Sequence, residues 1–147
     1  MKVKLFIMKS KFFIFVIILI FSSMLAVSAH DNLTIPENYT IVNESDNFTL
    51  LESDQYHSIS ISVMDNDTDK ELLKHLLESS MYDFTYRENY TKGSYDVEEN
   101  WYNYEYQRGI LYFCDNGNEL IVIDYKVPVL DDLGDSPVGV ILDSFCN

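Results

Sequence analysis

The sequence predicts an α+β domain, in which an antiparallel sheet carries two helices. Three observations support this fold class. Apolar and polar residues alternate with period two in several short segments, an Asn-Gly turn separates two of these segments, and two others have helical periodicity. The expected order is an N-terminal hairpin, one central helix, a three-stranded meander and a short C-terminal helix.

The first strands follow residues 30–37, a polar segment that is expected to be a linker into the fold. Residues 39–42 and 48–51 are β-prone runs separated by a polar segment that begins Asn43-Glu-Ser-Asp, and they predict a hairpin. Residues 57–63 read His-Ser-Ile-Ser-Ile-Ser-Val, the most regular alternation in the chain. Their apolar side chains are therefore expected to face a core, while the serines face water.

The central helix is expected from about Asp69 to Met81. It is preceded by Thr68-Asp-Lys-Glu71, which fits the capping box of a helix N-terminus. Four leucines follow at helical spacing and are expected to form one apolar stripe toward the sheet. These are Leu72, Leu73, Leu76 and Leu77.

The segment after this helix, residues 82–94, is polar and aromatic, and a turn is expected at Gly93. Period-two alternation returns from Tyr95 and continues until Gly109, which is expected to break the strand. On one face this alternation places Tyr102, Tyr104 and Tyr106, and on the other Trp101, Asn103 and Glu105.

The last strands are residues 110–114 and 119–127, on either side of Asp-Asn-Gly-Asn. This tetrapeptide predicts a hairpin, because Asn-Gly tolerates the positive φ that tight turns require. Pro128 ends the second strand. Asp135-Ser-Pro137 is expected to supply the N-cap and first position of a C-terminal helix. Its inward-facing residues are expected to be Val138, Ile141, Leu142 and Phe145.

This arrangement resembles the PsbP/DcrB-like fold. The features that carry the resemblance are a hairpin opened by Ile35-Pro36, one helix, a meander with an Asp-Asn-Gly turn, and a final helix reading Val-Ile-Leu-Asp-Ser-Phe. The chain is also similar to small exported archaeal proteins of unknown function. The resemblance covers about residues 35–146. It implies a small extracytoplasmic binding or accessory domain, and it supplies no catalytic residue.

The first 29 residues have the layout of a secretory signal peptide. Residues 1–11 carry four lysines and no acid, an unbroken run of ten apolar residues follows, and Val-Ser-Ala precedes the expected cleavage after residue 29. The alternative is an uncleaved anchor through residues 12–29, which is just long enough to span a membrane. In both cases the lysines stay in the cytoplasm, so the single domain of residues 38–147 is expected outside.

The composition of the exported part limits its partners. Removing residues 1–29 leaves 118 residues, enough for one domain. This part holds all 24 acidic residues but only six of the ten basic residues, which gives a charge of −18. Such a surface repels nucleic acid and favours cationic partners, so no nucleic-acid binding is expected. Salt adaptation is the alternative explanation for the acidity.

Six asparagines match the N-glycosylation pattern, where one or two matches are expected by chance. In an exported chain they are expected glycosylation sites. The alternative is a compositional bias in an organism that never modifies them. The six are Asn32, Asn38, Asn43, Asn47, Asn66 and Asn89.

Cys114 and Cys146 are the only cysteines, and both belong to the exported part. Two cysteines outside the cytoplasm usually pair, so a disulfide is expected. It would close a loop of 33 residues. Such a bridge stabilises the fold by roughly 3–4 kcal/mol. A buried thiol pair and a cysteine nucleophile are the alternatives.

No motif for catalysis or for metal binding stands out. Residues 65–69 begin like a calcium loop, but Lys70 and Leu76 stand where that loop needs Gly and Glu. The histidines do not have ligand spacing: they are His30, His57 and His75. Neither a cofactor nor enzyme activity is expected.

Two functions remain. The first is a non-catalytic protein of the cell surface or envelope, which acts by binding or structural association with a partner there. The second is a small secreted protein that binds or hydrolyses carbohydrate through an aromatic strand face. The residues of that expected ligand face are Trp101, Tyr102, Tyr104 and Tyr106.

Overall fold

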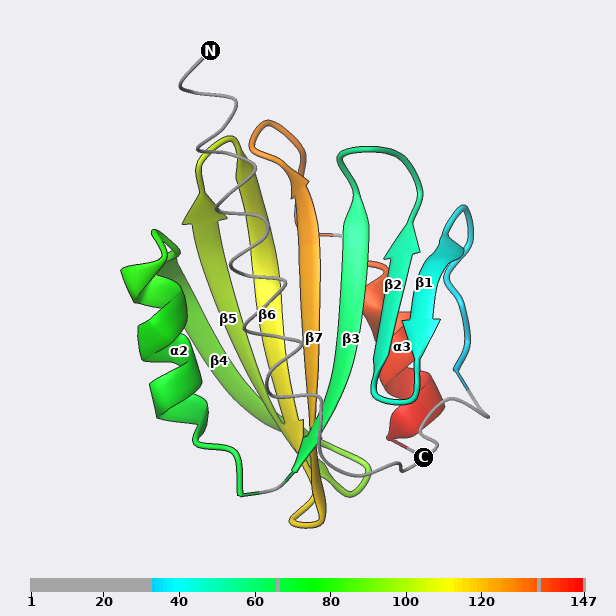
Figure 1. Cartoon of the computed structure of the whole chain (residues 1–147), viewed down its shortest axis with the longest axis vertical. Helices are drawn as coiled ribbons and strands as arrows, with labels where there is room; N and C mark the ends of the chain where they lie inside the picture. Colours follow the sequence, from blue (N-terminus) through cyan, green and yellow to red (C-terminus); the bar gives the residue numbers. More distant parts are fainter. Residues whose placement is uncertain (1–32, 66, 135, 147) are drawn as a thin grey trace.

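The computed structural model describes residues 33–65, 67–134 and 136–146. In this part of the chain the strands form one antiparallel sheet, in the order β1-β2-β3-β7-β6-β5-β4 (Figure 1). The predicted α+β class, with its hairpin and two helices, is confirmed. The strands are β1 (Thr40–Ser45), β2 (Phe48–Glu52), β3 (Ser58–Asp65), β4 (Asp83–Lys92), β5 (Tyr95–Tyr104), β6 (Gln107–Asp115) and β7 (Glu119–Pro128), and the helices are α2 (Lys70–Ser79) and α3 (Val138–Phe145).

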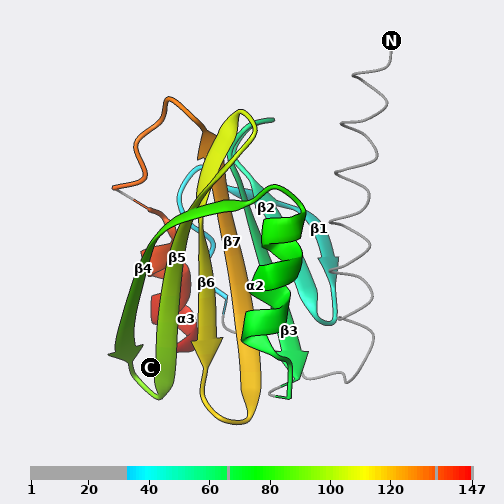
Figure 2. The ribbon, with the colours of Figure 1, turned by 90° about the vertical axis from the view of Figure 1, so that its left-hand side faces the viewer.

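The two helices lie on opposite faces of the sheet and make three layers (Figure 2). Alternation along β7 separates the two cores: Ile121 and Ile123 pack toward α3, while Leu120 and Val122 pack toward α2. No helix in the described part of the chain is long and apolar enough to cross a membrane. The expected leader of residues 1–29 lies outside the described residues.

Strand β4 is an element that the sequence pattern did not reveal, and it extends the expected three-stranded meander to four strands. It pairs with β5 and forms one edge of the sheet. Most of its side chains are exposed on both faces, so its apolar residues do not alternate. A β-bulge between Phe84 and Tyr86 further interrupts the period.

Helix α2 starts one residue later than the predicted capping box requires. Asp69, rather than Thr68, is the N-cap, and its carboxylate accepts a hydrogen bond of 3.0 Å from the amide of Leu72. The predicted leucine stripe is also only partly correct. Leu73 is buried, but Leu72 is exposed and Lys74 is buried beside the sheet.

Gly109 does not end a strand, because it lies inside β6. The chain turns earlier, at Glu105 with φ 52°. A Cβ on Gly109 would lie 2.2 Å from the carbonyl oxygen of Tyr125 and 2.5 Å from the hydroxyl of Tyr102. Glycine is therefore required here so that the Tyr102 side chain crosses β6 at close range.

The last predicted elements agree with the structure in position. The turn between β6 and β7 has Gly117 at φ 83°, as the Asn-Gly signal predicts. Helix α3 buries Val138, Ile141 and Leu142. Pro137 occupies its N-cap, and the hydroxyl of Ser136 accepts a hydrogen bond from the Val138 amide. The helix therefore begins one residue later than predicted, since Pro137 was expected at its first position; Asp135 lies outside the described residues.

Candidate functional site

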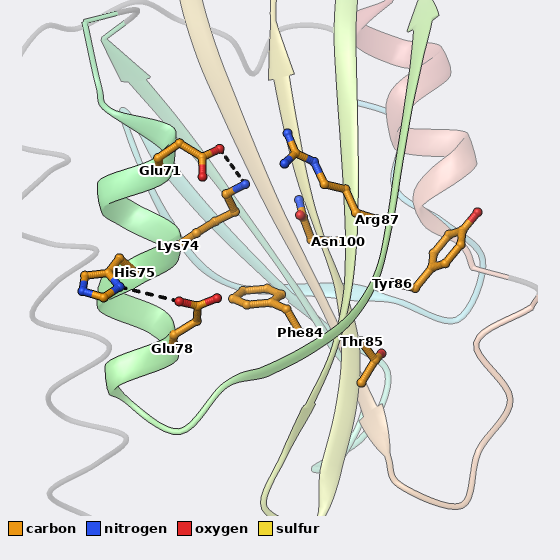
Figure 3. A pocket seen from close by; sticks show the side chains of 9 residues that line it. All are labelled: Glu71, Lys74, His75, Glu78, Phe84, Thr85, Tyr86, Arg87 and Asn100. Atoms are coloured by element: carbon orange, nitrogen blue, oxygen red, sulfur yellow. Dashed lines mark ion pairs between the residues drawn. The ribbon is translucent and has the colours of Figure 1, made fainter.

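A groove separates α2 from the edge of the sheet at β4, and we call it the α2–β4 groove (Figure 3). It exists because α2 packs through Leu73 on the neighbouring strands and leaves β4 largely exposed. The cavity has a volume of about 480 Å³. It is lined by Glu71, Lys74, His75, Glu78, Phe84, Thr85, Tyr86, Arg87 and Asn100.

Charged side chains at the base of the groove are joined in one network. The ammonium of Lys74 lies 2.9 Å from Glu98 and 2.7 Å from Glu71, and the guanidinium of Arg87 donates to the second oxygen of Glu98. The side chains of Lys74 and Glu98 are only 11% and 10% exposed. Buried charges of this kind are costly unless they are paired, as they are here.

Strand pairing explains how the sheet side of this network is positioned. Arg87 of β4 lies opposite Asn100 of β5, and Glu98 is two residues earlier on β5, on the same face. Lys74 comes from the inward face of α2, and its aliphatic stem lies against the sheet while its ammonium reaches Glu98. Three separate segments therefore converge on one carboxylate.

The electrostatics keep Glu98 ionised. Burial alone would raise the pKa of this carboxyl group. Hydrogen bonds from Lys74 and Asn100, together with the charges of Lys74 and Arg87, outweigh burial and lower the pKa below its ordinary value. Glu98 therefore serves as a fixed negative charge that holds two cations in place.

The rim of the groove is polar. Glu71, His75 and Glu78 project from exposed positions on α2, while Phe84 supplies an aromatic wall on β4. The cavity thus offers hydrogen-bond acceptors on its helix side and donors, from Arg87 and Asn100, on its sheet side (Figure 3). A small polar ligand with both donors and acceptors fits this lining.

A second cavity of about 320 Å³ continues along the same strands. Glu98 lines this cavity, whereas its partners Lys74 and Arg87 line the first. The ion network therefore lies between the two cavities. The other lining residues of the second cavity are Lys70, Asn89, Tyr90, Thr91, Asp96 and Val97.

The expected aromatic ligand face is not one exposed surface. Tyr102 and Tyr104 are buried, because they pack with Tyr82 in the core beneath α2. Tyr106 lies in the turn after β5 and is 82% exposed. Trp101 lies on the opposite face, half-buried beside the α3 core. Alternation had placed Tyr102 and Tyr104 correctly on one face and Trp101 on the other, but Tyr106 lies beyond the strand, and helix α2 covers the face that carries the two buried tyrosines.

The two cysteines meet in the core under α3 but are free thiols, so the predicted disulfide is not present in the structure. Cys114 and Cys146 are both buried in one apolar cluster, where a reduced cysteine packs as a small hydrophobic residue. Burial, and to a smaller extent the neighbouring Cys146, raises the pKa of Cys114 to about 12. Such a thiol stays protonated and is a poor nucleophile.

The predicted glycosylation sites differ in accessibility. Asn38, Asn43 and Asn89 are exposed. Asn47 is only 7% exposed, so its amide is poorly placed for modification in the folded state. The remaining two, Asn32 and Asn66, lie outside the described residues.

Sequence reasoning missed the residues of the ion network. Lys74 carries the clearest signal, because it interrupts a run of leucines at a position that faces the sheet. Arg87 carries none, since β4 itself was not predicted. Glu98 sits in an alternating strand among many acidic residues, so its burial becomes visible only in the folded chain.

Comparison with known proteins gives a match at the level of the fold. No protein-family model matches the sequence, and neither does any curated protein. The structure is similar to the solution structure of cyanobacterial PsbP (CyanoP) from Synechocystis sp. PCC 6803, with a TM-score of 0.53 and 12% sequence identity. The similarity covers 84% of this chain and 91% of that chain. It confirms the resemblance to the PsbP-like fold.

Proposed function

We propose that the protein is exported and acts outside the cytoplasm, at the cell surface or envelope, as a non-catalytic domain that binds a small polar ligand in the α2–β4 groove. The observation that carries this proposal is the network of Lys74, Glu98 and Arg87 at the base of the groove. Its cavity of about 480 Å³ has the size of a ligand site. Fixed charges in a cavity preorganise it for a polar molecule.

The state of Glu98 favours binding over catalysis. A general acid that works near neutral pH needs a raised pKa, whereas the pKa of Glu98 is lowered by its cationic neighbours. Lys74 is likewise held between two carboxylates, at 2.9 Å from Glu98 and 2.7 Å from Glu71. These groups therefore suit recognition rather than proton transfer.

Export is supported by the sequence of the N-terminal 29 residues and by the strongly acidic composition of the rest. The exposed sequons at Asn38, Asn43 and Asn89 would then carry glycans. Oxidation of Cys114 and Cys146 to a disulfide would have to precede their burial, with an extracytoplasmic disulfide as the oxidant that takes up two electrons and two protons as the S–S bond forms. Intact mass before and after deglycosylation, with and without reduction, tests these modifications.

A carbohydrate is the second candidate ligand. The observation that favours it is the combination of the Phe84 ring with donors and acceptors on opposite walls of the groove. Sugar hydroxyl groups both donate and accept hydrogen bonds, and aromatic rings offer a large contact area to the apolar face of a sugar. In this second candidate function the sugar binds in the α2–β4 groove, and not on the tyrosine face that the sequence predicted.

The test is a binding screen on the full-length chain with neutral oligosaccharides, amino acids and small dicarboxylates. Arg87→Ala is expected to remove binding of the best compound. Lys92→Ala is the matched control, because Lys92 lies on the same strand but pairs with Asp143 of α3, away from the groove. A screen without hits, or equal binding by both variants, contradicts the groove as the site. Hits confined to oligosaccharides favour the second candidate.

A further inference from the structure

On the other face of β4 and β5, aromatic and acidic side chains gather away from the groove. We propose that Tyr86, Glu88, Tyr90, Glu99 and Trp101, here called the aromatic–acidic patch, bind an arginine or lysine side chain of a basic protein partner. Tyr86 is also one of the residues that line the groove, but its side chain points away from α2 (Figure 3) and its strand partner Trp101 packs beside the α3 core, so the proposal does not depend on the ligand in the groove.

Strand register brings these side chains together. Tyr86 lies opposite Trp101, and Glu88 lies opposite Glu99. The Arg87 side chain, between Tyr86 and Glu88 in the chain, reaches Glu98 on the α2 side of the sheet, so the side chains of its two neighbours point to the other face. Tyr86 points away from α2 (Figure 3).

The rings form a corner that suits a cation. The ring centroids of Tyr86 and Trp101 are 5.8 Å apart, and the ring planes meet at 77°. The indole is oriented by Glu99, which accepts a hydrogen bond of 2.6 Å from the Trp101 Nε1–H. Tyr86 is 52% exposed. A cation within about 6 Å of either ring face is attracted by the ring quadrupole.

The negative charges of Glu88 and Glu99 lie close together without a neighbouring cation in the described part of the chain. Like charges directly opposite each other on neighbouring strands are destabilising. Glu88 and Glu99 occupy such positions, and among residues 33–65, 67–134 and 136–146 no cationic side chain lies within ion-pair distance of either. The charge of Glu88 raises the pKa of Tyr86, and burial and the charge of Glu99 act in the same direction. A bound cation relieves this concentration of negative charge.

Charge complementarity identifies the occupant as a basic protein segment. The exported part of the chain has a charge of −18, which steers cationic partners toward it. The patch adds local recognition, because aromatic faces and paired carboxylates together suit the planar guanidinium or the ammonium group.

The probe is an acetylated, amidated Gly-Arg-Gly-Arg-Gly peptide, compared with the same peptide carrying neutral citrulline. Trp101 is the only tryptophan of the chain, so its fluorescence reports directly on binding at the patch. We expect the arginine peptide to change this fluorescence saturably. We expect the citrulline peptide to bind at least about fivefold more weakly.

Variants distinguish local recognition from general attraction to an acidic protein. Tyr86→Ala and Glu99→Gln are each expected to raise the dissociation constant of the arginine peptide by about fivefold. The matched controls are Tyr106→Ala and Glu105→Gln, which remove an exposed tyrosine and an exposed carboxylate from the turn after β5. Circular dichroism checks that every variant is folded. Equal effects of patch and control variants, or equal binding of the two peptides, overturn the proposal.

Discussion

Glu98→Gln removes the carboxylate that accepts from both Lys74 and Arg87 at the base of the groove. Removing one partner of a buried ion pair costs about 3–5 kcal/mol. Two features reduce the loss: Lys74 keeps Glu71 at 2.7 Å, and the Arg87 side chain is half-exposed and solvated by water. We therefore expect the free energy of unfolding to fall by about 2–3 kcal/mol.

Urea unfolding at neutral pH, followed by circular dichroism, measures this loss. Glu105→Gln is the matched control, since Glu105 is exposed in the turn after β5. The control is expected to change the free energy of unfolding by less than about 0.5 kcal/mol. If Glu98→Gln lowers it no more than the control does, the network does not hold α2 against the sheet, and our reasoning about the groove is refuted.

Glu98→Gln is also expected to change how the free energy of unfolding depends on pH. Because the pKa of Glu98 is lowered in the folded state, its stabilising contribution is present above the unfolded pKa. The contribution is lost as the pH falls through the folded pKa. The stability advantage of the wild type over Glu98→Gln should therefore shrink in acid. If the difference in stability between the wild type and Glu98→Gln stays constant down to about pH 2, the pKa of Glu98 is not lowered in the folded state.

Three further predictions concern other parts of the molecule. Gly109→Ala is expected to lower the free energy of unfolding by about 2 kcal/mol or more, measured in urea, because the added Cβ meets the backbone of β7 at 2.2 Å; an unchanged midpoint contradicts this. The hydrogen bond that the His57 ring donates to Asp54, and next the one to Asp131, raise the pKa of His57 against the opposing effect of burial. Its contribution to stability is therefore present at low pH and is lost as the pH rises through the folded pKa. His57→Gln should therefore lower the free energy of unfolding more at pH about 5 than at about 9. An equal loss at both pH values would contradict the stabilising contacts of His57 with Asp54 and Asp131. Glu88→Lys is expected to stabilise the fold by roughly 0.2–1 kcal/mol, because it places a cation opposite a carboxylate on β5, and to weaken binding of the arginine peptide; a destabilised variant would contradict the like-charge strain.

The parts of the fold that the sequence predicted are those with one buried face. Strand β3 alternates because Ile59 and Ile61 enter the α3 core while Ser60 and Ser62 face the other way. The prediction that these serines face water is wrong for Ser62, which is buried. The turn after β6 was visible because Gly117 adopts a positive φ that few other residues tolerate. Strand β4 gave no such signal, because as an edge strand it buries neither face fully.

The candidate site was less predictable, because it depends on which segments meet. Alternation showed that Tyr102 and Tyr104 share a face, but it does not report that α2 covers them. Lys74, Arg87 and Glu98 come from three elements, and their pairing follows from the docking of α2 beside an unpredicted strand. The predicted disulfide brought Cys114 and Cys146 correctly into one cluster, but the structure has them as free thiols.

The central claim is that the α2–β4 groove binds a small polar ligand, and backbone amide shifts in an NMR titration test it most directly. The titrated compound is the best hit from the screen described above. The predicted result is a set of saturable shifts confined to residues 71–78, 84–87 and 98–100, and their loss in Arg87→Ala but not in Lys92→Ala. Shifts that cluster elsewhere, or that persist unchanged in Arg87→Ala, would contradict the claim.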